Sequence, residues 1–242
     1  MAAAGENDMQ AMGVGEQAER GGEAGAARDG LRHRKSLRER AYEAIKQQII
    51  TCELRPGEVL SEAAVSAALD IGRTPVHQAL DRLMLEGMVD VLPRKGVIVR
   101  PLSLDEALEI IDVRLVNETY CVRLAADHAD RADVDALRAN LDRMSDASRR
   151  RDVAEMMRLD RAFHTTLSSA GRNTILSDFL GNLHDRAQRF WFVSLRAPDH
   201  NDRVCEQHAA IMDAIASHDP DAAEAAMRFH IEAFRTNVTR QI

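Results

Sequence analysis

The sequence lacks any unbroken run of about 18 apolar residues, which is the length needed to cross a bilayer as a helix. Its N-terminus also lacks a basic stretch followed by an apolar core, the pattern of a secretory signal. Both absences predict a cytoplasmic protein with no membrane partner. Cysteine is scarce: Cys52, Cys121 and Cys205 are widely spaced and form no C-x-x-C pair. Neither a disulfide framework nor a thiolate zinc site is therefore expected, and we interpret the three thiols as buried packing residues.

Positive charge is also in short supply, because the net charge is −7 over 242 residues. The excess of acidic residues is uneven. Residues 31–101 contain 12 Lys and Arg against 9 Asp and Glu, whereas residues 1–30 contain 2 against 6 and residues 102–242 contain 18 against 24. A balance of +3 permits contact with nucleic-acid phosphates but does not by itself indicate it.

Residues 1–30 have almost no aromatic or β-branched side chains and predict a disordered tail. From Ser36 apolar residues recur at helical spacing, and Arg55-Pro56-Gly57 is a turn signal. Ser61 is expected to cap a second short helix, and Thr74 a third, with Pro75 at its first position and its end at Gly87.

Two β-like runs follow, residues 88–92 and 97–99, joined by residues 93–96. Three short helices and a hairpin predict a winged helix-turn-helix over residues 31–101. From Ser103 every segment has helical periodicity, which predicts an antiparallel bundle of six to seven helices over residues 102–242. Its helices are expected at about 103–129, 133–150, 152–170, 173–197, 200–217 and 219–239. The predicted fold class is mainly α.

The third helix of the winged domain is the predicted DNA reader, because the second helix of a helix-turn-helix places its N-terminal residues against base edges. Arg73, Thr74 and His77 lie there, and Arg94 with Lys95 occupies the tip of the hairpin. Guanidinium, hydroxyl and imidazole groups suit phosphates and bases. Winged helices also serve as protein-interaction modules, so the pattern alone leaves both functions open.

Several short motifs occur over roughly residues 36–101. They are Leu54-Arg55-Pro56-Gly57, Leu60-Ser61-Glu62, Gly72-Arg73-Thr74-Pro75-Val76, Ala79-Leu80-Asp81-Arg82-Leu83, Glu86-Gly87 and Pro93-Arg94-Lys95-Gly96. Together these motifs resemble those of the GntR-type regulators. The resemblance implies that Arg73 and Thr74 contact DNA. Ala63 and His77 stand where the family usually has arginines, and Gly72, Gln78 and Ala64 also depart from its pattern. The resemblance therefore implies no particular operator sequence.

The C-terminal half contains Asp160 and His164 on one helical face, with His208 and His230 on two later helices among apolar neighbours. One carboxylate and three neutral imidazoles suit a divalent metal, with zinc expected first and nickel, manganese or iron as alternatives. Each histidine taken alone is also compatible with a hydrogen-bonded core residue. The remaining five lie at polar segments or helix ends and are expected to be solvated: His33, His128, His184, His200 and His218.

This second pattern resembles the FCD ligand-binding domain of FadR-like GntR regulators. The matching pieces are Asp160-x-x-Phe163-His164-x-x-Leu167, Gly171-Arg172-Asn173, Glu206-Gln207-His208-x-x-Ile211-x-x-Ala214-Ile215 and Met227-Arg228-x-His230-Ile231. The resemblance implies that Asp160, His164, His208 and His230 hold the metal. It also implies a small organic acid effector, with Arg114 as its first cationic partner and Arg186 as a weaker one. Each arginine is alternatively a surface ion pair, for example Arg114 with Glu118.

Two functions remain at this point. The first is a homodimeric regulator that binds double-stranded DNA at paired half-sites and responds to an acid held at the metal. The second is a mononuclear metal-dependent enzyme acting on a small carboxylate. A di-metal oxidase is disfavoured because it needs several bridging Glu residues and paired Glu-x-x-His motifs, which this sequence does not contain. A general base is not identifiable from the residues, which favours the regulator.

Overall fold

The computed structural model describes residues 35–92, 96–194 and 200–241. The predicted disordered tail and the wing-tip residues Arg94 and Lys95 lie outside these described residues.

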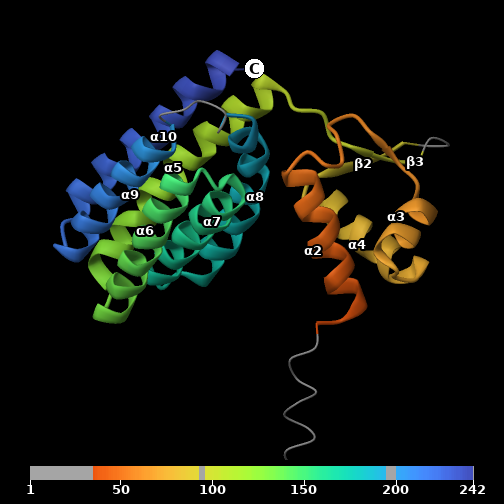
Figure 1. Ribbon diagram of the computed structural model, residues 1–242. Coiled ribbons are helices and arrows are strands. Elements are labelled where there is room, and N and C mark those ends of the chain that lie inside the picture. The colour runs from red at the N-terminus through yellow and green to blue at the C-terminus, as the bar shows by residue number, and fades with distance from the viewer. Residues whose placement is uncertain (1–34, 93–95, 195–199, 242) are drawn as a thin grey trace, which may run out of the picture. The chain divides into compact units, whose positions relative to one another are not determined.

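Within the described residues, the N-terminal elements are three helices and a small sheet (Figure 1). The helices are α2 (Leu37–Ile50), α3 (Glu62–Leu69) and α4 (Arg73–Leu85), and the predicted hairpin is β2 (Val89–Leu92) and β3 (Gly96–Val99). The winged helix-turn-helix is therefore confirmed as an arrangement of elements. Its core is formed by buried apolar residues from α2, α4 and the strands: Ala41, Ile45, Ile49, Val76, Leu80, Leu83, Val89 and Val99.

One strand was not predicted. β1 (Val59–Leu60) pairs antiparallel with β3, so that the sheet has the order β1-β3-β2. Two residues are too few to show an alternation of apolar and polar side chains, and β1 exists because β3 offers it a free edge. The sheet thereby fixes the chain between α2 and α3.

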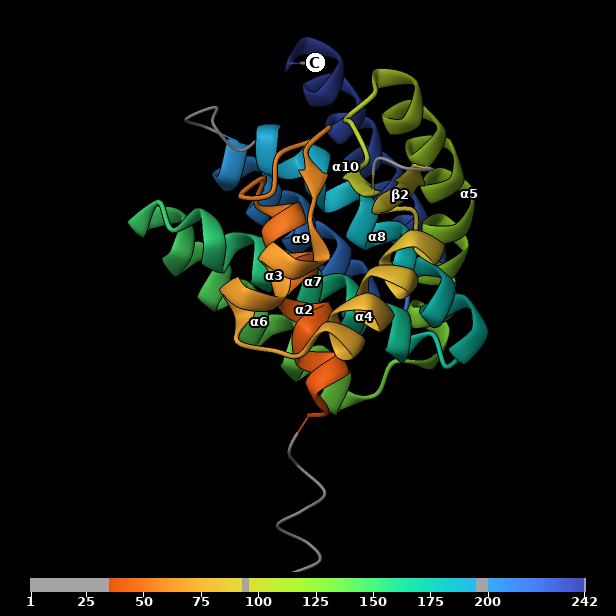
Figure 2. The same cartoon turned by 90° about the vertical axis from the view of Figure 1, so that its right-hand side faces the viewer.

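The helix-turn-helix pair differs from the prediction at one cap. Ser61 does cap α3, since its hydroxyl accepts from the backbone N–H of Ala64 at 3.4 Å. Thr74, however, does not cap α4: the helix begins one residue earlier, at Arg73, with Gly72 as the N-cap and no side-chain cap. Thr74 is thus an exposed residue of the first turn, with its side chain not used as a cap. Figure 2 shows the neighbouring helices α3 and α4.

The C-terminal part that the structure describes contains six helices, close to the predicted ranges. They are α5 (Leu104–His128), α6 (Arg131–Arg150), α7 (Val153–Ala170), α8 (Thr174–Ser194), α9 (His200–Ala216) and α10 (Pro220–Gln241). Local sequence explains their starts. Ser103 and Asp152 accept from backbone N–H groups of the first turns of α5 and α7, and Asp130 forms a reciprocal capping box with Asp133.

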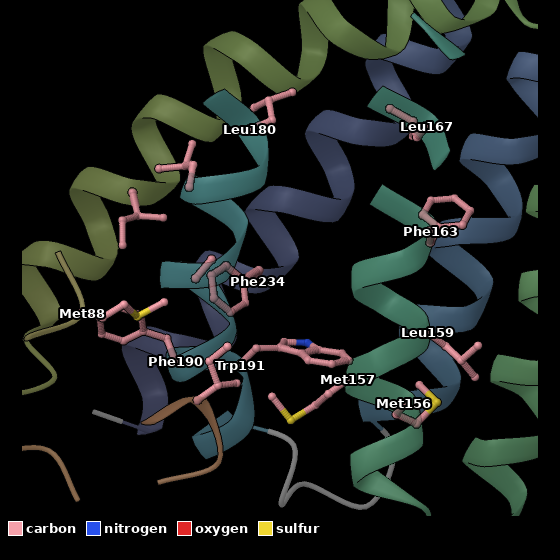
Figure 3. Packing of buried hydrophobic residues seen from close by; sticks show 14 of the residues in the cluster. Met88, Met156, Met157, Leu159, Phe163, Leu167, Leu180, Phe190, Trp191 and Phe234 are labelled. Carbon is pink, nitrogen blue, oxygen red and sulfur yellow. The ribbon is translucent and has the colours of Figure 1, made fainter. Parts of the chain in front are cut away.

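These helices form a bundle in which α5 contacts α7, α8, α9 and α10 (Figures 1 and 2). Much of its interior is apolar: Leu159, Phe163 and Leu167 lie along α7, and Trp191 and Phe234 come from α8 and α10 (Figure 3). None of the helices in the described ranges is long and apolar enough to cross a membrane.

The three cysteines, all among the described residues, form no disulfide. Only Cys121 is buried as predicted, whereas Cys52 and Cys205 are partly exposed. The expectation of three buried thiols is therefore wrong for two of them. Cys52 follows the end of α2 at a positive φ of 56°, in a turn at the surface rather than in a helix that packs on the core.

Candidate metal centre and DNA interface

The structure brings the four predicted metal-ligating residues together inside the bundle. Asp160 and His164 project from consecutive turns of α7, His208 from α9 and His230 from α10, and all four are buried. His164, His208 and His230 each offer one ring nitrogen, and these three nitrogens all lie within 4.8 Å of one another. Asp160 Oδ1 lies 3.9 Å from His164 Nε2 and 3.5 Å from His208 Nε2.

Polar partners orient two of the imidazole rings. His164 Nδ1 lies 3.1 Å from Glu118 Oε2, and His230 Nδ1 lies 3.0 Å from Gln207 Oε1. Each of these oxygens is an acceptor, so each ring carries its hydrogen on Nδ1 and presents the lone pair of Nε2. A ligating histidine in metalloproteins is usually held in this way through its second nitrogen.

The donor set of this cluster fits a divalent metal ion. His164 Nε2 and both ring nitrogens of His208 are buried and have no hydrogen-bond partner among the described residues. An unpaired buried polar atom costs free energy, and coordination would remove that cost. Metal bonds of about 2.0–2.2 Å place the donor atoms about 3–4 Å apart. The histidine nitrogens lie within 4.8 Å of one another, so small side-chain movements would bring them to the distances that an ion requires.

The protonation states also suit coordination, which requires neutral imidazole and ionised carboxylate. Burial lowers the pKa of His208 to about 3 and that of His230 well below its ordinary 6.5. Burial raises the pKa of Asp160, but the hydrogen bond from His184 and the nearby histidines outweigh it and hold that pKa well below 3.8. Imidazole lone pairs and a carboxylate charge are thus both present near neutral pH.

Sequence reasoning missed His184 at this site. It was expected to be solvated, yet it is buried on α8, with Nε2 at 3.0 Å from Asp160 Oδ2. Its spacing from Leu180, Ala187 and Trp191 is the helical signal that could have identified it, because all three are buried on the same face. His128 and His218 are exposed as predicted, while His33 and the side chain of His200 are not among those described.

A cavity of about 410 Å³ adjoins the metal-ligand cluster. Asp160, His164 and His230 line one part of it, and Trp191 and Phe234 add buried aromatic surface. Its lining thus combines the predicted metal ligands with apolar rings, and small-molecule sites usually have such a mixture of polar groups and apolar surface.

Arg114, the residue expected to be the first cationic partner of the effector, also lines this cavity. It is buried and paired with Glu118, with Nε at 2.5 Å from Oε1, and it lies over the ring of Phe234. The alternative of a surface pair is therefore wrong in one respect: the pair exists, but inside the protein. Burial raises the pKa of Glu118, but the charge of Arg114 outweighs it and holds that pKa well below 4.5.

Arg186 is not among the cavity-lining residues in the described part of the chain. Its Nη2 donates to Glu106 Oε1 at 2.5 Å on the neighbouring helix α5. The assignment of Arg186 as a weaker effector-binding residue therefore stays a prediction, and the structure places this side chain in an ion pair away from the cavity-lining residues. Two other arginines reach the cavity, Arg203 on α9 and Arg240 on α10, and both are exposed.

Arg73, Thr74 and His77 are exposed on the first turns of α4. Because Val76 and Leu80 of the same helix are buried, the helix turns these three polar residues outward together. Such a surface matches the reading face of a helix-turn-helix.

His77 has two acidic neighbours on this face. Its Nδ1 lies 2.9 Å from Glu62 Oε1 on α3, and its Nε2 lies 3.5 Å from Asp81 Oδ2 one turn further along α4. The hydrogen bond with Glu62 and the charge of Asp81 raise the pKa of His77 above 6.5. The residue that replaces a family arginine is thus a titratable cation.

Comparison with known families decides the class of this protein. Residues 37–99 match the family described as bacterial regulatory proteins, gntR family, and residues 109–233 match the FCD domain. The FCD match alone spans more than half of the chain. This chain is a GntR-family regulator. It is accordingly a DNA-binding transcription regulator with the FadR-like combination of domains that the sequence predicted.

Relatives that match most of this GntR-family regulator are also named as transcription regulators. The HTH-type transcriptional repressor RspR of Escherichia coli K12 is 27% identical over 206 residues, covering 85% of this chain and 90% of the relative. The repressor NanR of Citrobacter rodentium is 31% identical over 227 residues, covering 83% and 84%. A regulator from an unstable DNA locus of Streptomyces ambofaciens is 31% identical over 203 residues, covering 82% and 84%.

Solved structures share the fold. E. coli McbR/YncC superposes with a TM-score of 0.78 at 20% identity, covering 86% of this chain and 99% of that one. A GntR-type regulator from Rhodococcus sp. RHA1 superposes with a TM-score of 0.73 at 23% identity, covering 86% and 100%.

Proposed function

We propose that this GntR-family regulator controls transcription in response to a small organic acid, which binds at a divalent metal ion in the FCD domain. Asp160, His164, His208 and His230 hold the ion, and zinc is the expected metal. The observation that carries the proposal is the buried cluster of three histidines next to a cavity. Three of their ring nitrogens, His164 Nε2 and both of His208, have no hydrogen-bond partner in the described chain. The metal supplies a positive charge that a carboxylate can bind.

The cavity supports an acid as the effector. Arg114 stands at the cavity wall and offers a second cationic contact, while Trp191 and Phe234 offer apolar surface to a carbon skeleton. Arg203 and Arg240 are exposed lining residues, and they favour entry of an anion. An acid of a few carbon atoms with its carboxylate at the metal satisfies all of these groups.

A sensor fits the site better than a catalyst. A metal-dependent hydrolase needs a positioned general base near a metal-bound water. Glu118 is the carboxylate next to His164, but its contacts with Arg114 and His164 hold its pKa well below 4.5, which makes it a weak base for a substrate proton. The same contacts give a binding site rigid orientation, which recognition requires.

The response is expected to pass through a homodimer in the cytoplasm. Helix-turn-helix proteins bind paired half-sites by presenting two reading helices at a fixed spacing, so an effector that changes the spacing changes operator affinity. The relatives RspR and NanR are named repressors, which supports repression as the direction of control.

The first experiment tests the metal. Elemental analysis of the purified protein should find a divalent ion, and a chelator should lower the melting temperature. Zinc at about 100 times its Kd would stabilise the fold by about 2.7 kcal/mol. His208→Ala should abolish this response, and His128→Ala, which changes an exposed histidine of α5, should retain it. A metal-free protein whose melting temperature ignores both chelator and added zinc, nickel, manganese and iron would remove the metal from the proposal.

The second experiment tests the effector and the DNA response. Citrate, malate and succinate should be screened for thermal shifts of the metal-loaded protein, and each hit should be added to band-shift assays with the protein's own upstream region. A true effector changes operator affinity, and Arg114→Ala or His208→Ala abolishes that change. Acids that bind equally well to both variants would argue against this cavity. DNA binding that ignores sequence at low salt would argue against the operator role.

A further inference from the structure

His184 is a buried residue next to the metal-ligand cluster, that is, Asp160, His164, His208 and His230. The family resemblance assigns no role to His184. It lies on α8, whereas the four predicted ligands come from α7, α9 and α10. Its side chain and that of Asp160 are 7% and 6% exposed. The ring centroid of His184 lies 4.4 Å from that of His164, so this imidazole directly adjoins the cluster.

The two oxygens of Asp160 face different partners. Oδ1 lies toward Nε2 of His164 and of His208, at 3.9 and 3.5 Å. Oδ2 lies 3.0 Å from Nε2 of His184. An ionised carboxylate only accepts hydrogen bonds, so Nε2 of His184 carries the hydrogen and donates it to Oδ2. A nitrogen that carries a hydrogen cannot bind a metal.

We propose that His184 is a positioning residue that fixes Asp160 as a one-oxygen metal ligand, holding Oδ2 by a hydrogen bond so that Oδ1 faces the ion. This inference rests on the proposed metal function and adds the role of one residue to it. Asp160 would then occupy one coordination position instead of two, which leaves an additional position for the carboxylate of the effector.

The hydrogen bond to Asp160 is what orients the His184 ring. Nδ1 of His184 is buried and has no hydrogen-bond partner among the described residues. A packed ring with one hydrogen bond loses its orientation when that bond is lost, and Asp160 simultaneously loses a donor. Removal of such outer-sphere partners typically lowers metal affinity by about 10–100-fold.

Three substitutions separate this role from simple packing. His184→Gln places an amide nitrogen at the reach of Nε2 and can still donate to Oδ2. His184→Asn carries the same amide group one carbon shorter, at the position of Nδ1, where it cannot reach Oδ2. His184→Leu fills the volume without any donor. His128→Leu, at an exposed histidine, is the matched control.

The measurement is zinc affinity by competition with a chromophoric chelator, together with the visible spectrum of the cobalt-substituted protein and the stability of the metal-free forms in urea. We expect Leu and Asn at position 184 to weaken zinc binding by about 10–100-fold, and Gln to restore most of it. The cobalt spectra of the Gln variant and the unsubstituted protein should agree, because the ligands are unchanged. Metal-free stability reveals any variant that merely unfolds.

Two results would overturn the inference. Zinc affinity of His184→Leu equal to that of the unsubstituted protein would show that Asp160 needs no positioning. A Gln variant as weak as the Leu variant, with a cobalt spectrum that reports a lost nitrogen ligand, would show that His184 itself binds the metal. Both results differ from failure of the proposed metal function, in which the unsubstituted protein itself binds no zinc.

Discussion

Phe163 and His208 lie ring against ring, with centroids 4.2 Å apart and planes inclined by only 4°. Phe163 is fully buried on α7 and one residue away from His164, whose ring it meets edge-on at 5.8 Å. Both ring nitrogens of His208 lack a hydrogen-bond partner within the described chain. Stacking on Phe163 is therefore a contact that sets the plane of this imidazole.

Phe163→Leu should reduce zinc affinity about tenfold, because His208 loses the surface that orients it. The metal-free protein should lose about 1 kcal/mol of stability from the lost stacking and volume. Calorimetric zinc titration and urea unfolding with chelator measure the two effects. Phe179→Leu, at a half-exposed position of α8, is the control and should change neither. Unaltered zinc affinity in Phe163→Leu would contradict an orienting role.

The pair of Arg114 and Glu118 should show strong coupling in a double-mutant cycle. Either Arg114→Met or Glu118→Leu leaves one buried charge without its partner and should destabilise the metal-free protein by about 3–5 kcal/mol. The double variant should be much less destabilised than the sum of the two, because it buries no unpaired charge. Urea unfolding measures all four proteins, and additive losses would show that the pair is not coupled.

DNA affinity should fall as the pH rises from 6.5 through the pKa of His77, which lies above 6.5. Protonated His77 offsets the charges of Glu62 and Asp81, and the raised pKa means that this contribution is complete below 6.5 and lost at higher pH. The neutral form leaves both carboxylates uncompensated beside DNA phosphates. Operator affinity should therefore be measured by fluorescence anisotropy from pH 6 to pH 8.5.

The His77→Arg variant carries a permanent charge and should lose most of this pH dependence, whereas His128→Arg should keep it. An identical pH profile for His77→Arg and the unsubstituted protein would assign the effect to other groups.

Ala63→Arg should strengthen DNA binding and make it more sensitive to salt. Ala63 is exposed on α3, where the family usually has an arginine. Each added phosphate contact should steepen the slope of log K against log salt by about 0.9. The same substitution at Ala136, exposed on α6, adds equal charge to the C-terminal bundle instead of the winged domain and should leave the slope unchanged. Equal slopes for both variants would place α3 away from the DNA backbone.

The residues alone were sufficient to predict the helices, because amphipathic periodicity and local caps act within a few residues of chain. The six helices from α5 to α10 follow from repeating apolar positions bounded by Gly171, Pro220 and polar caps. The same periodicity predicted that Asp160, His164, His208 and His230 face the bundle interior, and all four are buried. β1 was missed because a strand of two residues exists only through its pairing with β3.

Tertiary structure alone decided which polar groups meet inside the bundle. His184 lies on α8 and Glu118 on α5, each far along the chain from its partner on α7, and periodicity does not say which faces of different helices touch. Packing of α8 against α7 places His184 on Asp160, and packing of α5 places the Arg114–Glu118 pair beside His164. The sequence by itself determined the four candidate ligands; only the packing of separate helices decided what holds them in position.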